Sequence, residues 1–277
     1  MSDAHSTTMN RRMPRRPRAF TLFGMALGLV ALTVSLGCQK AEVATESAAI
    51  QASSKLDRAV LAHPSRTEDD RYRDTGFKPI EVYSFLGIEP EMTVADIWPG
   101  GGYHTHLLSL LMADEGKVLS VLGPLYLNED YEESVRDQLK ERIDAGQLTN
   151  VEVIGPLDDV ADESIDVMIT VRNYHDLGDK DARTAVLPDL MKKLKPGGVL
   201  GVIEAYTPKE GIDEPFHRIN EDLVVEELTA AGFELVDRSN ILLNEADTYD
   251  FDGREDDAPI HRYFIHRFVH KYQKPAA

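Results

Sequence analysis

Short apolar segments alternate with amphipathic ones from residue 55 to the end of the chain. The apolar segments have the length of buried strands, and seven are expected, at 92–97, 118–122, 151–154, 165–171, 199–204, 233–239 and 263–272. Val135, Leu139 and Ile143 recur at every fourth residue, which predicts an amphipathic helix between the second and third strands. Strands that alternate with helices are typical of a parallel, doubly wound α/β sheet.

Further helices are expected at 56–62, 80–86, 107–112, 181–194 and 220–231. Asn220 is a suitable N-cap, Gly87 and Gly232 end the helices before them, and Pro188 marks a start or a kink. No full helix separates the last two strands, so the last strand is expected to return antiparallel. The predicted fold is therefore an α/β, doubly wound seven-stranded sheet, Rossmann-like, with an antiparallel last strand.

The N-terminal segment has the pattern of an export signal. Five arginines precede residues 19–37, which carry no charge, and Cys38 follows as the only cysteine. The run that ends in Cys38 resembles the bacterial lipobox, in which the cysteine receives lipid before the signal is cut. We expect a lipoprotein-type signal peptide at 1–37, a tether at 38–54 and a domain at 55–277. An uncleaved membrane helix is the alternative, because about 20 apolar residues span a bilayer.

This pattern predicts a protein exported to the cell envelope and anchored in a membrane through lipidated Cys38, on the periplasmic side in a Gram-negative cell. A single cysteine also excludes an intramolecular disulfide. The net charge is −18, and residues 1–37 contribute +4 to it, so the remainder is strongly acidic. Nucleic acid is not an expected partner, because phosphate binding needs clustered Lys and Arg. A small-molecule substrate is expected, and the oligomeric state stays open.

The sharpest local feature is a glycine-rich loop after the first predicted strand, Asp96-Ile97-Trp98-Pro99-Gly100-Gly101-Gly102-Tyr103. Glycine lets the backbone approach a ligand closely, and ligands of open α/β sheets bind at the carboxyl ends of the strands. A dinucleotide fold would need Gly-x-Gly-x-x-Gly, but Trp98 and Tyr103 occupy two of its glycine positions. The second strand also ends in Gly123-Pro124 and offers no acid for a ribose hydroxyl. A nicotinamide oxidoreductase is therefore the weaker interpretation.

Three motifs in order instead resemble a family of bacterial class I methyltransferases, many of them exported. These are the glycine loop, the run Val171-Arg172-Asn173-Tyr174-His175-Asp176, and the run from Leu194-Lys195-Pro196-Gly197-Gly198 to Glu204. The resemblance extends from about residue 63 to residue 275. It implies the seven-stranded sheet, S-adenosylmethionine as cofactor, and methyl transfer.

Under this resemblance, Asp96, Gly100 and Gly102 approach the methionine part of the cofactor, and Asp158 or Asp159 holds the adenine amino group. Trp98 either packs the loop or stacks on adenine. The second strand lacks the acid that usually binds the ribose, and Glu115, Glu129 or Asp130 would have to replace it. The cofactor-binding residues implied are Asp96, Trp98, Gly100, Gly101, Gly102, Asp158, Asp159, Arg172 and Asn173.

The motif after the fourth strand supplies the candidate catalytic residues, Asn173, His175 and Glu204. Methyl transfer from a sulfonium needs mainly alignment, and a base is needed only if the acceptor must lose a proton. Asn173 can bond the acceptor or the cofactor amine, and His175 can accept a proton near neutral pH. Glu204 can hold either His175 or the acceptor. The structural alternative is that Asn173 and Asp176 cap the turn and His175 packs.

The predicted function is therefore that of a transferase, an S-adenosylmethionine-dependent methyltransferase with an unidentified small-molecule acceptor. The alternative is an exported ligand-binding lipoprotein that keeps this fold without turnover. No metal site is expected, because His104 and His106 lie two apart on a predicted helix and point to different faces.

Overall fold

A computed structural model describes residues 45–46, 54–112, 116–123, 129–255 and 257–276, and the side chains of 129–131 are not described. The chain divides into two units, Met1–Glu42 and Val43–Ala277, and the described residues belong to the second. The predicted leader and Cys38 lie outside the described residues. Within the described part, no helix is both long enough and apolar enough to cross a membrane.

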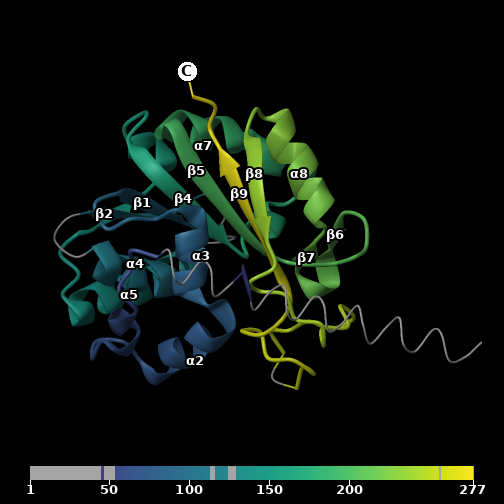
Figure 1. Ribbon diagram of the computed structural model, residues 1–277, viewed down its shortest axis with the longest axis horizontal. Coiled ribbons are helices and arrows are strands. Elements are labelled where there is room, and N and C mark those ends of the chain that lie inside the picture. The colour runs from purple at the N-terminus through teal and green to yellow at the C-terminus, as the bar shows by residue number, and fades with distance from the viewer. Residues whose placement is uncertain (1–44, 47–53, 113–115, 124–128, 256, 277) are drawn as a thin grey trace, which may run out of the picture. The chain divides into compact units, whose positions relative to one another are not determined.

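A seven-stranded sheet forms the centre of this unit (Figure 1), with strand order β3-β2-β1-β4-β5-β9-β8. Strands β1 to β5 run parallel to one another, and β9 is antiparallel to both β5 and β8. The predicted doubly wound sheet with an antiparallel last strand is confirmed. The strands are β1 (Thr93–Ile97), β2 (Lys117–Val121), β3 (Val151–Ile154), β4 (Ile165–Val171), β5 (Leu194–Ala205), β8 (Glu234–Ser239) and β9 (Arg267–Gln273).

Helices cover both faces of the sheet because successive strand residues point to opposite sides. Val94 and Val118 pack with α3 and α4 on one face, whereas Ala95 and Leu119 pack with α7 and α8 on the other. The helices are η1 (Arg58–Ala62), α2 (Glu68–Phe77), α3 (Pro79–Leu86), α4 (Tyr103–Met112), α5 (Glu129–Gly146), η2 (Leu157–Asp159), η3 (Tyr174–Leu177), α6 (Lys180–Ala185), α7 (Leu187–Lys193), η4 (Glu214–Phe216) and α8 (Glu221–Ala230).

Helix α2 was not predicted, because it lacks an apolar stripe. Its buried side chains include Phe77 and Asp70, and its N-terminus is closed by a capping box between Thr67 and Asp70. Arg66, which is almost fully buried, forms two hydrogen bonds to Asp74 on the same helix, at 2.6 and 2.7 Å. Polar contacts therefore hold this helix in place of the apolar stripe that a surface helix usually has.

Four element predictions need correction. The strand expected at 199–204 begins earlier, at Leu194. The segment expected as a helix at 56–62 is a five-residue 3₁₀ helix. The helix expected at 181–194 is two helices, α6 and α7, with the break just before Pro188. The last strand begins at Arg267 and not at Tyr263, and a short hairpin of β6 (Ile212–Asp213) and β7 (Arg218–Ile219) lies outside the main sheet.

Candidate functional site

The glycine-rich loop lies at the carboxyl end of β1, as predicted. Trp98, Gly100 and Gly102 all have positive φ, at 60°, 52° and 77°. Glycine adopts this backbone without strain, whereas Trp98 does so at a cost. The backbone N–H of Trp98 donates to the Val121 carbonyl at 2.9 Å, which continues the pairing of β1 with β2 into the loop.

Two cavities open beside this loop, and Trp98 lines both. The first, of about 440 Å³, has apolar walls that include Ile97 and Leu190, and Asp158 lines it as well. The second, of about 550 Å³, is lined mainly by polar and charged groups and includes the other side of the loop. Both volumes fall within the range of about 300–1,000 Å³ that small-molecule sites occupy.

The Trp98 indole is buried, with 4% of the residue exposed, and it lies against Gly123 after β2. A Cβ built on Gly123 would lie 2.1 Å from the indole Nε1. The aromatic ring thus occupies the space beside the position where the sequence lacks a ribose-binding acid. Trp98 therefore packs against the loop after β2, and stacking on adenine, the other role considered for it, stays a prediction.

Asp96 is buried beneath the loop and lines the polar cavity. Its carboxylate accepts a hydrogen bond from the Thr105 hydroxyl at 2.7 Å, and that hydroxyl lies 3.0 Å from the Ser120 hydroxyl. Burial raises the pKa of Asp96 to about 6, although the bonds from Thr105 favour the charged form. Asp96 is therefore an acid whose charge is costly unless a cation pairs with it.

Asn173 connects the ends of β1 and β4. Its side-chain amide donates to the Trp98 carbonyl at 3.1 Å and to the Val171 carbonyl at 2.9 Å. The preceding Arg172 has φ of 58°, and its N–H donates to the Ile203 carbonyl at 2.8 Å. Both amide hydrogens of Asn173 are used within the protein, so only its carbonyl oxygen is left for a ligand.

Glu204 orients His175, as predicted, and it does so from a fully buried position. The His175 Nδ1 donates to Glu204 Oε2 at 2.6 Å, since a carboxylate only accepts. The other Glu204 oxygen accepts the backbone N–H groups of Asn173 and Tyr174 at 2.8 and 2.7 Å. One carboxylate therefore fixes both the His175 ring and the turn that carries it.

A second buried carboxylate, which was not predicted, anchors the same turn. The Tyr174 hydroxyl donates to Glu227 on α8 at 2.8 Å. Arg183 donates to the two Glu227 oxygens at 3.0 and 2.7 Å. Since these residues lie 44 to 53 positions apart, no local pattern links them.

The other predicted residues fall into two groups. Asp158 lines the apolar cavity, whereas Asp159 is exposed and is not among the residues that line it. Gly100, Gly101 and Arg172 line the polar cavity together with Asp96, Trp98, Asn173 and His175. Glu115 and the side chains of Glu129 and Asp130, the suggested ribose-binding replacements, lie outside the described residues.

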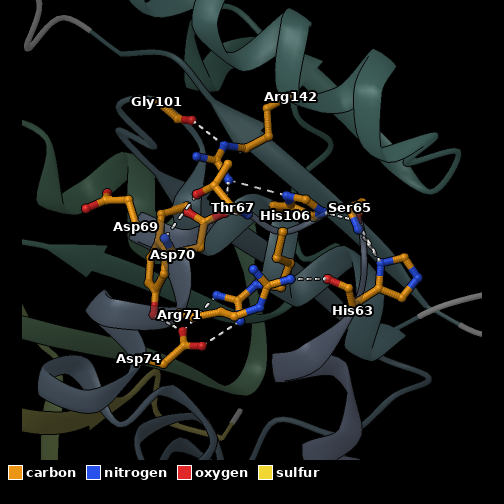
Figure 2. A network of polar contacts seen from close by, with 12 residues as sticks. His63, Ser65, Thr67, Asp69, Asp70, Arg71, Asp74, Gly101, His106 and Arg142 are labelled. Atoms are coloured by element: carbon orange, nitrogen blue, oxygen red, sulfur yellow. Dashed lines mark hydrogen bonds and ion pairs between the residues drawn. The ribbon is translucent and has the colours of Figure 1, made fainter.

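A network of polar contacts supports the loop from behind (Figure 2). Arg142 on α5 donates to the Gly101 carbonyl at 2.8 Å and to Asp70 at 2.8 Å. The His106 Nδ1 lies 3.3 Å from Arg142, and its Nε2 lies 2.9 Å from the Ser65 hydroxyl. This network joins α2 to the loop, so the unpredicted helix also positions the site.

Two of the arginines that line the polar cavity have unused hydrogen-bonding capacity. The Nε atoms of Arg73 and Arg172 are buried and have no hydrogen-bond partner among the described residues. The Arg73 guanidinium lies 4.2 Å from the centre of the Tyr103 ring, and burial lowers the pKa of Arg172 to about 10. Arg73 comes from α2, which is why the motifs did not reveal it.

Comparison with known proteins supports the fold. A SAM-dependent methyltransferase from Aquifex aeolicus is 20% identical over 79% of this chain and 99% of its own, with a TM-score of 0.52. A putative methyltransferase from Bacillus halodurans is 16% identical over 73% of this chain and 100% of its own, with a TM-score of 0.50. The [4+2]-cyclase SpnF is 14% identical over 78% of this chain and 86% of its own, with a TM-score of 0.52.

These likenesses show the class I methyltransferase fold. No family model matches the sequence, and a search of curated proteins finds no match. One of the three similar structures is named as a cyclase, so the reaction has to be argued from the site and not from the fold.

Proposed function

We propose that this protein binds S-adenosylmethionine and transfers its methyl group to a small, anionic acceptor. The observation that carries the proposal is the pair of cavities that meet at Trp98, one mainly apolar and one polar, at the carboxyl ends of β1 and β4. An adenosine needs apolar walls with few polar groups, whereas a methionine end and its acceptor need charged ones.

The residues present fit the cofactor at both ends. Asp158 and the apolar walls suit the adenine, and Asp96 suits the methionine ammonium, whose charge would offset the cost of an ionised buried acid. A Cβ built on Gly100 would meet nothing within 4 Å, so its backbone faces open space. At the ribose, Trp98 offers an apolar ring in place of a carboxylate. When bound, the cofactor supplies a methyl group on a positively charged sulfur.

The protein's own groups then select and orient the acceptor. Arg73 and Arg172 supply positive charge for a carboxylate or phosphate, on the acceptor or on the methionine end. Glu204 fixes the His175 ring so that Nε2 points away from Glu204, toward Asp176, which also lines the cavity. A free Nε2 there can accept the proton of an acceptor hydroxyl, thiol or amine.

The chain offers a direct test, because Trp98 is its only tryptophan. Titration of the full chain with S-adenosylmethionine should change the tryptophan emission saturably, and calorimetry should give the same affinity. Trp98→Phe should abolish the optical signal while calorimetry still detects binding. Absence of binding up to millimolar cofactor would exclude the proposal, and preferential binding of NAD would favour a nicotinamide oxidoreductase.

Turnover needs a second experiment, with methyl-labelled cofactor and a cell-envelope extract. His175→Ala should lower the rate about 10²–10⁴-fold if the acceptor loses a proton to this residue. His261→Ala is the matched control, since His261 is exposed and is not among the residues that line the cavity. Cofactor binding without transfer to any component would favour the exported ligand-binding lipoprotein.

We also propose that the protein is exported and anchored through lipidated Cys38. The support is the sequence pattern of residues 11–38 alone. Cys38→Ser should move the protein from the membrane fraction to the soluble fraction. A variant that stays in the membrane would favour an uncleaved helical anchor.

A further inference from the structure

Three donor atoms from two separate segments converge in the polar cavity. Asp176 Oδ1 lies 3.2 Å from His175 Nε2 and 3.0 Å from His217 Nδ1, and one atom from each of the three residues lies within 4.8 Å of the others. All three residues line the 550 Å³ cavity. We propose that His175, Asp176 and His217 bind a divalent transition-metal ion.

The hydrogen bonding of His175 calls for a cation at this point. Its Nδ1–H donates a hydrogen bond to Glu204, so in the neutral ring Nε2 has a lone pair and no proton. That pair faces Asp176 Oδ1, which also carries only electron pairs, at 3.2 Å. Two such atoms repel each other unless a proton or a metal ion lies between them. The buried Glu204 thus prepares Nε2 as a ligand, as carboxylates behind metal-binding histidines do.

The donor set and spacing suit a transition metal. Two imidazoles and one carboxylate favour Zn²⁺, Fe²⁺, Co²⁺ or Mn²⁺ over Mg²⁺ and Ca²⁺, which prefer oxygen ligands. Metal–ligand bonds of about 2.0–2.1 Å at tetrahedral angles place ligand atoms roughly 3.3 Å apart, which is close to the two separations that involve Asp176 Oδ1, at 3.2 and 3.0 Å. For His217 to bind the ion through Nδ1, the proton of its neutral ring has to lie on Nε2. Three protein ligands leave a fourth position for a molecule in the cavity.

The two segments are each held firmly enough to keep the ligands in place. The turn that carries His175 and Asp176 is fixed by Glu204 through three hydrogen bonds. His217 is followed by Arg218, which is fully buried and forms two hydrogen bonds of 3.0 Å to the buried Asp247. Such anchoring lowers the conformational cost of collecting the ligands on binding.

This proposal does not depend on the proposed function, because metal binding can be measured without S-adenosylmethionine. With an ion bound, Nε2 of His175 is a ligand and no longer a base. An acceptor hydroxyl or thiol in the open position would then lose its proton more easily, as metal-bound water does. The ion and the free His175 are thus two ways of activating the same acceptor.

The test is titration of the metal-stripped full chain with Zn²⁺, and with Co²⁺ as an optical probe. We expect one saturable site per chain, a cobalt absorption spectrum typical of four or five ligands, and no competition by excess Mg²⁺. His217→Ala and Asp176→Asn should each weaken binding at least about 100-fold, and Glu204→Gln about 10–100-fold. His261→Ala should bind as the parent does, and circular dichroism should show that all variants are folded.

Absence of saturable binding would overturn the proposal. It would indicate that a proton, and not a metal ion, lies between His175 and Asp176. Equal binding by His217→Ala and the parent would also overturn it, because the ion would then lie elsewhere. Neither result would affect the cofactor titration, so the two proposals can fail separately.

Discussion

The indole of Trp98 lies directly on Gly123, although the two residues belong to loops after different strands. A Cβ on Gly123 would come within 2.1 Å of the indole Nε1, so only glycine fits there. Trp98 also lines both cavities. The shape of the site therefore depends on two residues together: Trp98, a large residue in the glycine-rich loop, and Gly123, which follows β2 where the resemblance leads one to expect an acid.

Gly123→Ala should displace the indole and destabilise the protein. Crowding of a packed site costs about 1–3 kcal/mol, and urea unfolding measures it. The emission of the single tryptophan in the native state should shift at the same time. Gly155→Ala, in the wall of the same cavity, is the control, because its nearest neighbour lies 3.8 Å away. Equal stability of the two variants would contradict this packing.

Asp96→Asn should stabilise the protein in a pH-dependent manner. The folded state raises the pKa of Asp96 from 3.8 to about 6, so it holds the proton more tightly than the unfolded chain. The stability of the parent should therefore fall as pH rises from about 4 to about 6. Above that range Asp96 is ionised in the folded state as well, so the loss of stability stays constant. At pH 8 the variant should be more stable by roughly 3 kcal/mol, and at pH 4 the gain should vanish.

Thermal unfolding of parent and variant at pH 4 and pH 8 checks this expectation. Asp257→Asn, at an exposed position, serves as the control, and the difference in stability between it and the parent should be the same at both pH values. A variant with Asn at position 96 that is less stable than the parent at both values would show that the Thr105 hydrogen bond outweighs the cost of burial.

Glu227→Gln should destabilise the turn that carries His175. The substitution leaves Arg183 buried without its charged partner, and breaking such a pair costs about 3–5 kcal/mol. Glu226→Gln is a matched control on the same helix, since its ion pair with Lys180 is exposed and contributes about 0–1 kcal/mol. Urea unfolding that gives the same cost for both variants would refute a structural role for Glu227.

Arg142→Met should loosen the glycine-rich loop from behind. The variant loses the hydrogen bond to the Gly101 carbonyl and leaves Asp70 buried without its charged partner, at a cost of about 1–3 kcal/mol. We expect the affinity for S-adenosylmethionine to fall about tenfold by calorimetry, which corresponds to 1.4 kcal/mol. Lys140→Met, an exposed change on the same helix, should alter neither quantity.

The order of apolar segments predicted the sheet well. Five of the seven strands lie within one residue of their expected bounds, because a buried strand needs a continuous apolar run and such runs are visible in the sequence. Beyond the backbone, the glycine loop and the His175–Glu204 pair were also predicted, since they sit at the ends of those strands. Helix α2 was missed because capping and ion pairs stabilise it in place of an apolar face.

The sequence by itself determined the layers of the fold and the edge of the sheet where a site could form, because hydrophobic periodicity is a local property. Only the tertiary structure decided which polar groups meet there. Trp98 and Gly123, or Asp176 and His217, come from segments whose distance in space is set by strand order and not by spacing along the chain. A side chain's partners depend on how whole elements pack, and no run of neighbouring residues encodes that.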